Sequence, residues 1–219
     1  IVNSGKITVE GNDSAGITVA GTLDGKFVHD GETNVLGDRS VGVELHDVTG
    51  DVRLAGTVTA KGEDAVAARF AGDVDGTLQV QGTIAATGYR STTLPSDTSK
   101  LDADDLLQGG SAIVVEGDVA KGIRFAVPPA DADKDDPDED KDGIEDAKEG
   151  TAKITSFGAA PAVVIGATGR DIAIGALPAT ASGFGIIIDG SITGTGVYAG
   201  VDGNGMVIGG RGGDGSGAG

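Results

Sequence analysis

The chain has 219 residues with no cysteine, no tryptophan and a formal net charge of −18, which excludes disulfides and thiolate metal sites and disfavours nucleic acid, whose phosphates an acidic surface repels. The longest apolar stretches, such as 159–167, are too short to cross a bilayer, so this segment is not expected to span a membrane. With 40 glycines and only five phenylalanines, the interior must consist of small aliphatic side chains, which favours an all-β fold with many turns.

A repeat of about 25 residues is the main signal along the chain. Short apolar segments end at a shared position, which is occupied in turn by Gly21, Asp47, Gly72, Gly117, Gly166 and Gly190. The intervals are 26, 25, 45, 49 and 24 residues, so the two long ones equal one repeat plus an insertion of 20 or 24 residues. Self-similarity at such a period is typical of a solenoid.

Alternation of apolar and polar residues within each repeat predicts strands that turn one face toward a core. The inward pairs of the first strand are Ile17 and Val19, Val43 and Leu45, Ala68 and Phe70, Ile113 and Val115, Ala162 and Val164, and Ile186 and Ile188, with Met206 and Ile208 starting one more repeat. Those of the second strand are Val52 and Leu54, Leu78 and Val80, Ile123 and Phe125, and Ile172 and Ile174. A third strand follows in some repeats, with the pairs Val58 and Ala60, and Ile84 and Ala86.

Three short strands per coil, joined by corners rich in Gly, Asp and Asn, predict a right-handed parallel β-helix, or β-solenoid, of about seven turns. We expect a single domain over residues 1–219 with two loop insertions, at about 88–110 and 128–150, and a Gly-rich tail over 209–219. An antiparallel β-sandwich is the alternative. It does not require a 25-residue phase to persist across two insertions.

The first insertion predicts a short helix. Residues 99–102 have the pattern of a capping box, and residues 101–108 are long enough for two helical turns before Gly109. We expect this segment to cover the flank of the solenoid. Asp102, Asp104 and Asp105 remain additional cation ligands in the alternative interpretation.

The second insertion contains an Asp-rich stretch with the spacing of a 12-residue calcium loop, including a glycine, Gly143, at its sixth position. We predict one bound Ca²⁺. Its ligands would be the side chains of Asp138, Asp140, Asp142, Asp146 and Glu149 and the main-chain carbonyl of Ile144. The alternative is a solvated acidic loop, since residues 131–149 hold eight Asp and three Glu against three Lys. The stretch also resembles the DxDxDGxxD pattern of thrombospondin type 3 repeats and dockerin modules, which implies a structural ion rather than a switch.

Weaker patterns have simpler interpretations. The tail over 209–216 matches the calcium nonapeptide of RTX repeats only in part, and we interpret it as a linker. The dipeptides His29-Asp30 and His46-Asp47 fall at different phases of the repeat, with His29 aligned to the inward Leu54. Packing or corner hydrogen bonding is therefore a better interpretation of both histidines than a catalytic dyad.

The repeats, in segments such as GNDSAGITVAG, GDRSVGVELHDVTGDVRLAGTV and GEDAVAARFAGDV, resemble the β-helical passenger region of alphaproteobacterial, sphingomonad-type autotransporters. In that family the passenger is secreted through a C-terminal outer-membrane barrel. The resemblance therefore implies an extracellular location at a bacterial cell surface, with attachment to the outer membrane through a region outside this segment. It says little about molecular activity, because passengers differ widely in what they do.

From these observations we expect an extracellular structural or adhesive surface module rather than an enzyme, stabilised by calcium. The pattern shows no amphipathic cap at either end, so we expect either that more coils continue the stack in a longer chain or that another subunit pairs there. Pairing with copies of the same chain would form a filament. A cell-surface or glycan ligand is a second expected partner.

The alternative is a polysaccharide-active β-helix enzyme, a lyase or hydrolase. It would use a stripe of outward charged residues: Arg53, Arg124 and Arg170, with Asp51, Asp118 and Asp171. The absence of tryptophan argues against it, because sugar-binding clefts usually carry aromatic platforms.

Overall fold

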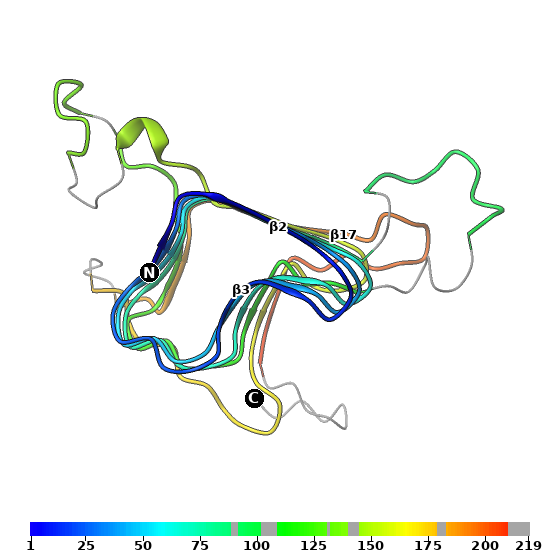
Figure 1. Cartoon of the computed structure of the whole chain (residues 1–219), viewed down its shortest axis with the longest axis horizontal. Helices are drawn as coiled ribbons and strands as arrows, with labels where there is room; N and C mark the ends of the chain where they lie inside the picture. Colours follow the sequence, from blue (N-terminus) through cyan, green and yellow to red (C-terminus); the bar gives the residue numbers. More distant parts are fainter. Residues whose placement is uncertain (89–91, 102–108, 131, 140–144, 179–182, 210–219) are drawn as a thin grey trace.

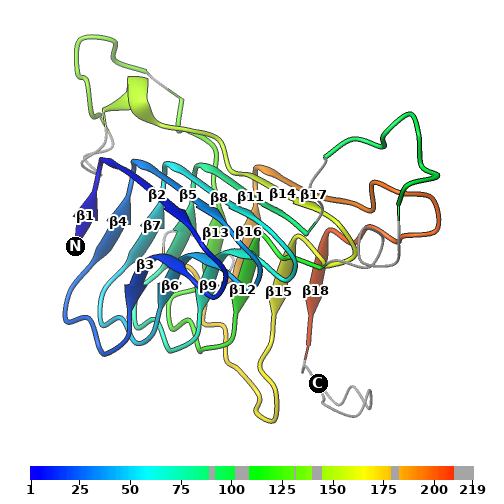
Figure 2. The ribbon, with the colours of Figure 1, turned by 45° about the vertical axis from the view of Figure 1, so that its right-hand side comes forward.

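The computed structural model describes residues 1–88, 92–101, 109–130, 132–139, 145–178 and 183–209. These residues form strands β1 to β18 in three parallel sheets of six strands each, and they contain no α-helix. Successive strands enter the three sheets in turn, an architecture consistent with a parallel β-helix. Seen along the stack, the strands of each sheet superpose (Figure 1), and from the side they form regular rungs (Figure 2).

Each sheet contains every third strand. Sheet A consists of β1 (Val2–Asn3), β4 (Phe27–His29), β7 (Val52–Leu54), β10 (Leu78–Val80), β13 (Ile123–Phe125) and β16 (Ile186–Ile188). Sheet B consists of β2 (Lys6–Glu10), β5 (Glu32–Leu36), β8 (Thr57–Lys61), β11 (Thr83–Thr87), β14 (Lys153–Phe157) and β17 (Ser191–Thr195). Sheet C consists of β3 (Ala15–Val19), β6 (Val41–Leu45), β9 (Val66–Phe70), β12 (Ile113–Val115), β15 (Val163–Ile165) and β18 (Met206–Ile208). We call one strand from each sheet, taken in chain order, a rung.

The core is a column of stacked apolar side chains. The inward pairs expected in β6, β7, β8, β9, β10, β11, β12 and β13 are all buried, and Met206 and Ile208 continue sheet C as predicted. The largest buried side chains are those of Phe27, Phe70 and Phe125. Burying a side chain of this size contributes about 1.5–3 kcal/mol, so the column supplies most of the driving force for folding.

The corner between sheets B and C repeats a local motif. Gly11, Gly37 and Gly62 have φ angles of 149°, 154° and 147°, and Arg39, two residues after Gly37, has φ of 53°. A Cβ atom on Gly37 would lie 2.0 Å from the carbonyl oxygen of Gly11, one rung away. Glycine is therefore required here both for its φ angle and for the close approach of the stacked backbones.

A ladder of aspartates lines the corner between sheets C and A. The Oδ1 atom of Asp47 accepts a hydrogen bond from the main-chain N–H of Asp73 at 3.0 Å, and Oδ1 of Asp73 accepts one from the N–H of Asp118 at 2.8 Å. Oδ1 of Asp118 continues the pattern to the N–H of Ala173 at 2.9 Å. Each carboxylate therefore satisfies a backbone donor of the next rung at a corner where the strands themselves have ended.

Two parts of the predicted strand pattern are wrong. In β15, Val163 and Ile165, rather than Ala162 and Val164, continue the register of β12. The cause is the apolar run from 162 to 165, which is buried throughout and therefore contains no alternation to set the register.

The second error concerns the last complete rung. Residues 186–188, predicted as a first strand, form β16 and pair with β13 in sheet A. The segment 172–174, predicted for that place, contributes a single bridge between Ile174 and Val119. The long connection between β15 and β16 contains Ile172 and Ile174, which have the two-residue spacing of inward strand positions.

The two predicted insertions are loops at the corners of the coil, and the strands before and after them keep their register with the neighbouring rungs. The first connects β11 to β12, and the second connects β13 to β14 and includes a 3₁₀ turn, Asp146–Lys148. Of the expected helix over 101–108, residues 102–108, including Asp102, Asp104 and Asp105, lie outside the described residues, as does the tail over 210–219. The described part of the chain has no helix with the length and apolar character needed to span a bilayer.

One polar side chain is enclosed in the core near the first rungs. His29 stacks on Leu54, as expected from the repeat, and is fully buried. Its Nδ1 accepts a hydrogen bond from the N–H of Gly31 at 3.2 Å, whereas Nε2 has no partner among the described residues. Burial lowers the pKa of His29 below its ordinary value of 6.5, because the cation loses its hydration.

This burial predicts a pH-dependent stability. The pKa of His29 is lower in the folded state, so the unfolded chain binds the proton more readily. The contribution of His29 to stability is therefore greatest above about pH 6.5 and falls as the pH decreases toward the lowered pKa. Urea unfolding of wild type should show this loss between pH 8 and pH 5, and His29→Leu should abolish that component. His46→Leu, at a partly exposed position, is the control and should retain it. Equal pH dependence in wild type and His29→Leu would contradict the assignment.

Candidate functional site

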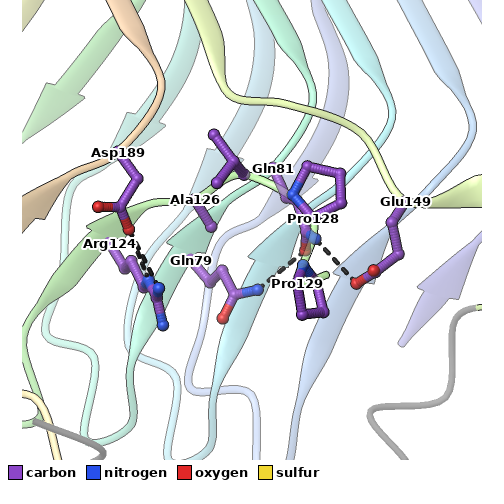
Figure 3. A pocket seen from close by; sticks show the side chains of 9 residues that line it. Gln79, Gln81, Arg124, Ala126, Pro128, Pro129, Glu149 and Asp189 are labelled. Atoms are coloured by element: carbon purple, nitrogen blue, oxygen red, sulfur yellow. Dashed lines mark hydrogen bonds and ion pairs between the residues drawn. The ribbon is translucent and has the colours of Figure 1, made fainter. Parts of the chain in front are cut away.

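A pocket of about 590 Å³ lies on the outer face of sheet A, where the second insertion leaves and rejoins the stack (Figure 3). It is lined by Gln79, Gln81, Arg124, Ala126, Val127, Pro128, Pro129, Glu149 and Asp189. The strand period explains why polar groups gather here. Gln79 and Arg124 are the middle residues of β10 and β13 and pair in register, so both point away from the core.

Gln81 joins the strands to the insertion. Its Oε1 accepts hydrogen bonds from Arg53 Nη2 at 2.6 Å and from Gln79 Nε2 at 2.9 Å, and its Nε2 donates to Glu149 Oε1 at 2.9 Å. Arginine can only donate and a carboxylate can only accept, so the two charged neighbours fix the orientation of this amide. Gln79 must then use its Nε2 as the donor to Gln81, which leaves its own Oε1 as an acceptor for other groups.

Glu149 ties the returning end of the insertion to the sheet. Its side chain is 1% exposed and that of Arg53 is 11% exposed, and Arg53 Nη2 lies 3.4 Å from Glu149 Oε1. Two opposite charges removed from water attract strongly, and each would be costly to bury alone. The pair therefore fixes the position of one wall of the pocket.

Arg124 and Asp189 form the opposite side of the pocket from Glu149, with Gln79 between them (Figure 3). Arg124 donates from Nε at 3.2 Å and from Nη2 at 3.0 Å to the same oxygen, Asp189 Oδ2. Arg124 Nη1 and Asp189 Oδ1 have no partner among the residues that the structure describes. The side chains are 40% and 35% exposed, so this ion pair is accessible to solvent.

The predicted calcium ligands are described only in part. Asp140, Asp142 and Ile144 lie outside the described residues, whereas Asp138, Asp146 and Glu149 lie within them. The N–H of Asp146, the ninth position of the predicted loop, donates to the carbonyl of Pro137, the residue before the first position, at 2.8 Å. Glu149, at the twelfth position, contacts Gln81 and Arg53. Among the described residues, which omit 140–144, no three acidic or histidine side chains form a cluster able to hold a metal.

The charged stripe expected for an enzyme is divided between two places. Arg124 lines the pocket on sheet A, and Arg53 donates to Gln81 of its lining. Arg170 lies elsewhere: its Nη2 contacts Asp73 Oδ1 at 3.0 Å, and its Nη1 lies 3.7 Å from Asp118 Oδ1. Arg170 thus reinforces the aspartate ladder. Gln79, Gln81 and Asp189 were not predicted as site residues. Gln79 alone had a visible signal, as an outward polar residue between the inward Leu78 and Val80.

Comparisons with protein-family models, with curated proteins and with solved structures found no match. The pocket must therefore be interpreted from its own chemistry.

The buried pair makes a specific prediction about stability. Glu149→Ala should destabilise the protein by about 3 kcal/mol, because it removes a buried carboxylate that contacts both Arg53 and Gln81. Glu32→Ala, which removes an exposed pair with Lys6, is the matched control and should cost no more than about 1 kcal/mol. Urea unfolding measures both. The double variant Arg53→Met with Glu149→Leu should recover much of the loss, since neither charge remains. Equal losses in Glu149→Ala and Glu32→Ala would show that the buried contact contributes little.

Proposed function

We propose that the chain is an extracellular structural and adhesive module of a bacterial cell surface, a right-handed β-helix of about seven turns that associates end to end into filaments. The observation that carries this proposal is the state of the two end rungs. Strands β1, β2 and β3 at one end and β16, β17 and β18 at the other have a neighbour on one side only. Ile208, which lies in the same inward column as Phe70 and Val115, is 60% exposed, although those two residues of the central rungs are buried.

The register of the stack favours a head-to-tail contact between copies. If the pairing rule is continued from the last rung into the first rung of a second copy, Ile192 stacks on Ile7 in sheet B. In sheet C, Met206 stacks on Ile17 and Ile208 on Val19. In these columns of sheets B and C apolar residues meet apolar residues, whereas in sheet A the same rule places Ile188 on Asn3. A heterologous contact of this kind, with different surfaces on the two partners, generates an open filament.

We further propose that the second insertion binds one structural Ca²⁺. Its support is the spacing of the carboxylates in the sequence, together with the hydrogen bond from the N–H of Asp146 to the carbonyl of Pro137. Asp138, Asp140, Asp142 and Asp146 and the carbonyl of Ile144 would supply oxygen ligands, which Ca²⁺ prefers. The Oε1 atom of Glu149 contacts Gln81 and Arg53, so a bidentate contribution from Glu149 would compete with these contacts.

A polysaccharide-cleaving activity is a weaker proposal. Glycoside hydrolysis needs two carboxyl groups with different protonation states on either side of the scissile bond. The two carboxylates at the pocket, Asp189 and Glu149, each accept hydrogen bonds from neighbouring side chains. These contacts suit ligand binding or structural support better than acid–base chemistry.

The filament proposal predicts concentration-dependent association. Sedimentation velocity and electron microscopy should reveal end-to-end oligomers of the wild-type chain. Ile208→Lys should reduce the oligomer fraction at least tenfold, because it places a charge in the apolar contact. Leu36→Lys, at a 48% exposed position on the flank, is the control and should associate as wild type does. A chain that stays monomeric at all concentrations, or equal association of both variants, would contradict end-to-end pairing.

The calcium proposal predicts saturable binding of about one ion in a calorimetric titration after complete chelation. The double variant Asp140→Asn with Asp142→Asn should lose this binding. Asp133→Asn with Asp135→Asn removes the same charge from the same insertion outside the predicted ligand positions, and should retain it. Equal weakening by both pairs would indicate general attraction of cations to an acidic loop, and the absence of any binding would refute the site.

A further inference from the structure

We infer that the pocket on the outer face of sheet A binds a short segment of an uncharged glycan. This inference gives the adhesive part of the proposed function a ligand class, and it rests on that function for its biological setting.

The available groups include both donors and acceptors. Because Arg53 and Glu149 fix the orientation of Gln81, and Gln81 fixes that of Gln79, the Oε1 atom of Gln79 is an available acceptor. At the Arg124–Asp189 pair, both guanidinium nitrogens in contact use one carboxylate oxygen, so Arg124 Nη1 is an available donor and Asp189 Oδ1 an available acceptor. A hydroxyl group donates and accepts at once. Two neighbouring hydroxyls of a sugar ring can therefore accept from Arg124 and donate to Asp189.

Charge argues for a neutral ligand. Arg124 is compensated by Asp189, and Glu149 by Arg53, so the pocket presents no net charge of its own. The chain as a whole carries −18, which opposes the approach of an acidic polysaccharide. An uncharged polyol avoids this penalty.

Shape and surface fit the same ligand. A volume of about 590 Å³ lies within the usual range for small-molecule sites. The residues that line the pocket include no aromatic side chain. The rings of Pro128 and Pro129 and the side chain of Val127 lie beside the polar groups and offer aliphatic surface to the C–H faces of a sugar in place of an aromatic platform. The site is also held in place, because the buried Glu149 and Gln81 attach the insertion to the sheet. A wall fixed in this way reduces the entropy lost on binding.

A binding assay with defined sugars tests this inference. Titration calorimetry would measure the binding of neutral trisaccharides of glucose, galactose, mannose and xylose, with trigalacturonate as the acidic comparison. We expect at least one neutral trisaccharide to bind saturably and at least tenfold more tightly than trigalacturonate. Asp189→Asn and Gln79→Leu should each weaken that binding about tenfold or more. Glu116→Gln, which alters the equivalent ion pair with Arg69 on sheet C, should leave it unchanged.

Each result is decisive for the pocket. The absence of saturable binding to all neutral trisaccharides, tighter binding of trigalacturonate, or unchanged affinity in both pocket variants would overturn the inference. Melting curves of the variants separate a lost ligand contact from lost folding, because the two substituted side chains are partly exposed. The end-to-end association of the same samples is a separate measurement, so filaments without sugar binding, or sugar binding without filaments, would identify which proposal has failed.

Discussion

Parallel hydrogen bonding between successive rungs is the constraint on which the rest of this structure depends. Because each strand pairs with the strands one coil before and after it, identical positions lie about 4.8 Å apart along the stack. Each side chain therefore packs on the side chains at the same position in the neighbouring rungs. Apolar residues stack on apolar residues, the corner glycines repeat because a Cβ would strike the rung below, and polar groups persist when the column satisfies them, as in the aspartate ladder.

The same constraint explains how much of the fold the sequence reveals. Where polar and apolar residues alternate, as in β6 and β9, the inward positions follow directly from the pattern. Where a strand is apolar on both sides, as in residues 162–165, alternation is lost, and the register expected from the sequence is wrong by one residue. The long connection before β16 adds a second difficulty, because Ile172 and Ile174 have strand spacing but only one of them forms a bridge. Only pairing with neighbouring rungs resolves such cases.

The two candidate sites also differ in how far the sequence alone reveals them. The acidic loop was visible in the sequence because its ligand spacing is local and lies within twelve residues. The pocket was not, because its contacts join distant residues: Gln81 and Glu149 are separated by 68 positions, and Arg124 and Asp189 by 65. A glutamine that follows a short strand has many possible partners in the sequence. Its role becomes defined only when an insertion returns a carboxylate to the same face.

The direction of the hydrogen bonds also has a mechanical consequence. The strands run across the stacking axis, so the hydrogen bonds between rungs lie along that axis. A load applied between the two ends would pull on these bonds in tension, three short strands at a time, rather than shear a long sheet. The chain would then yield by releasing one coil after another from an end. Such stepwise lengthening would dissipate mechanical work gradually, which would suit the proposed role of an adhesive module between a cell surface and its ligand.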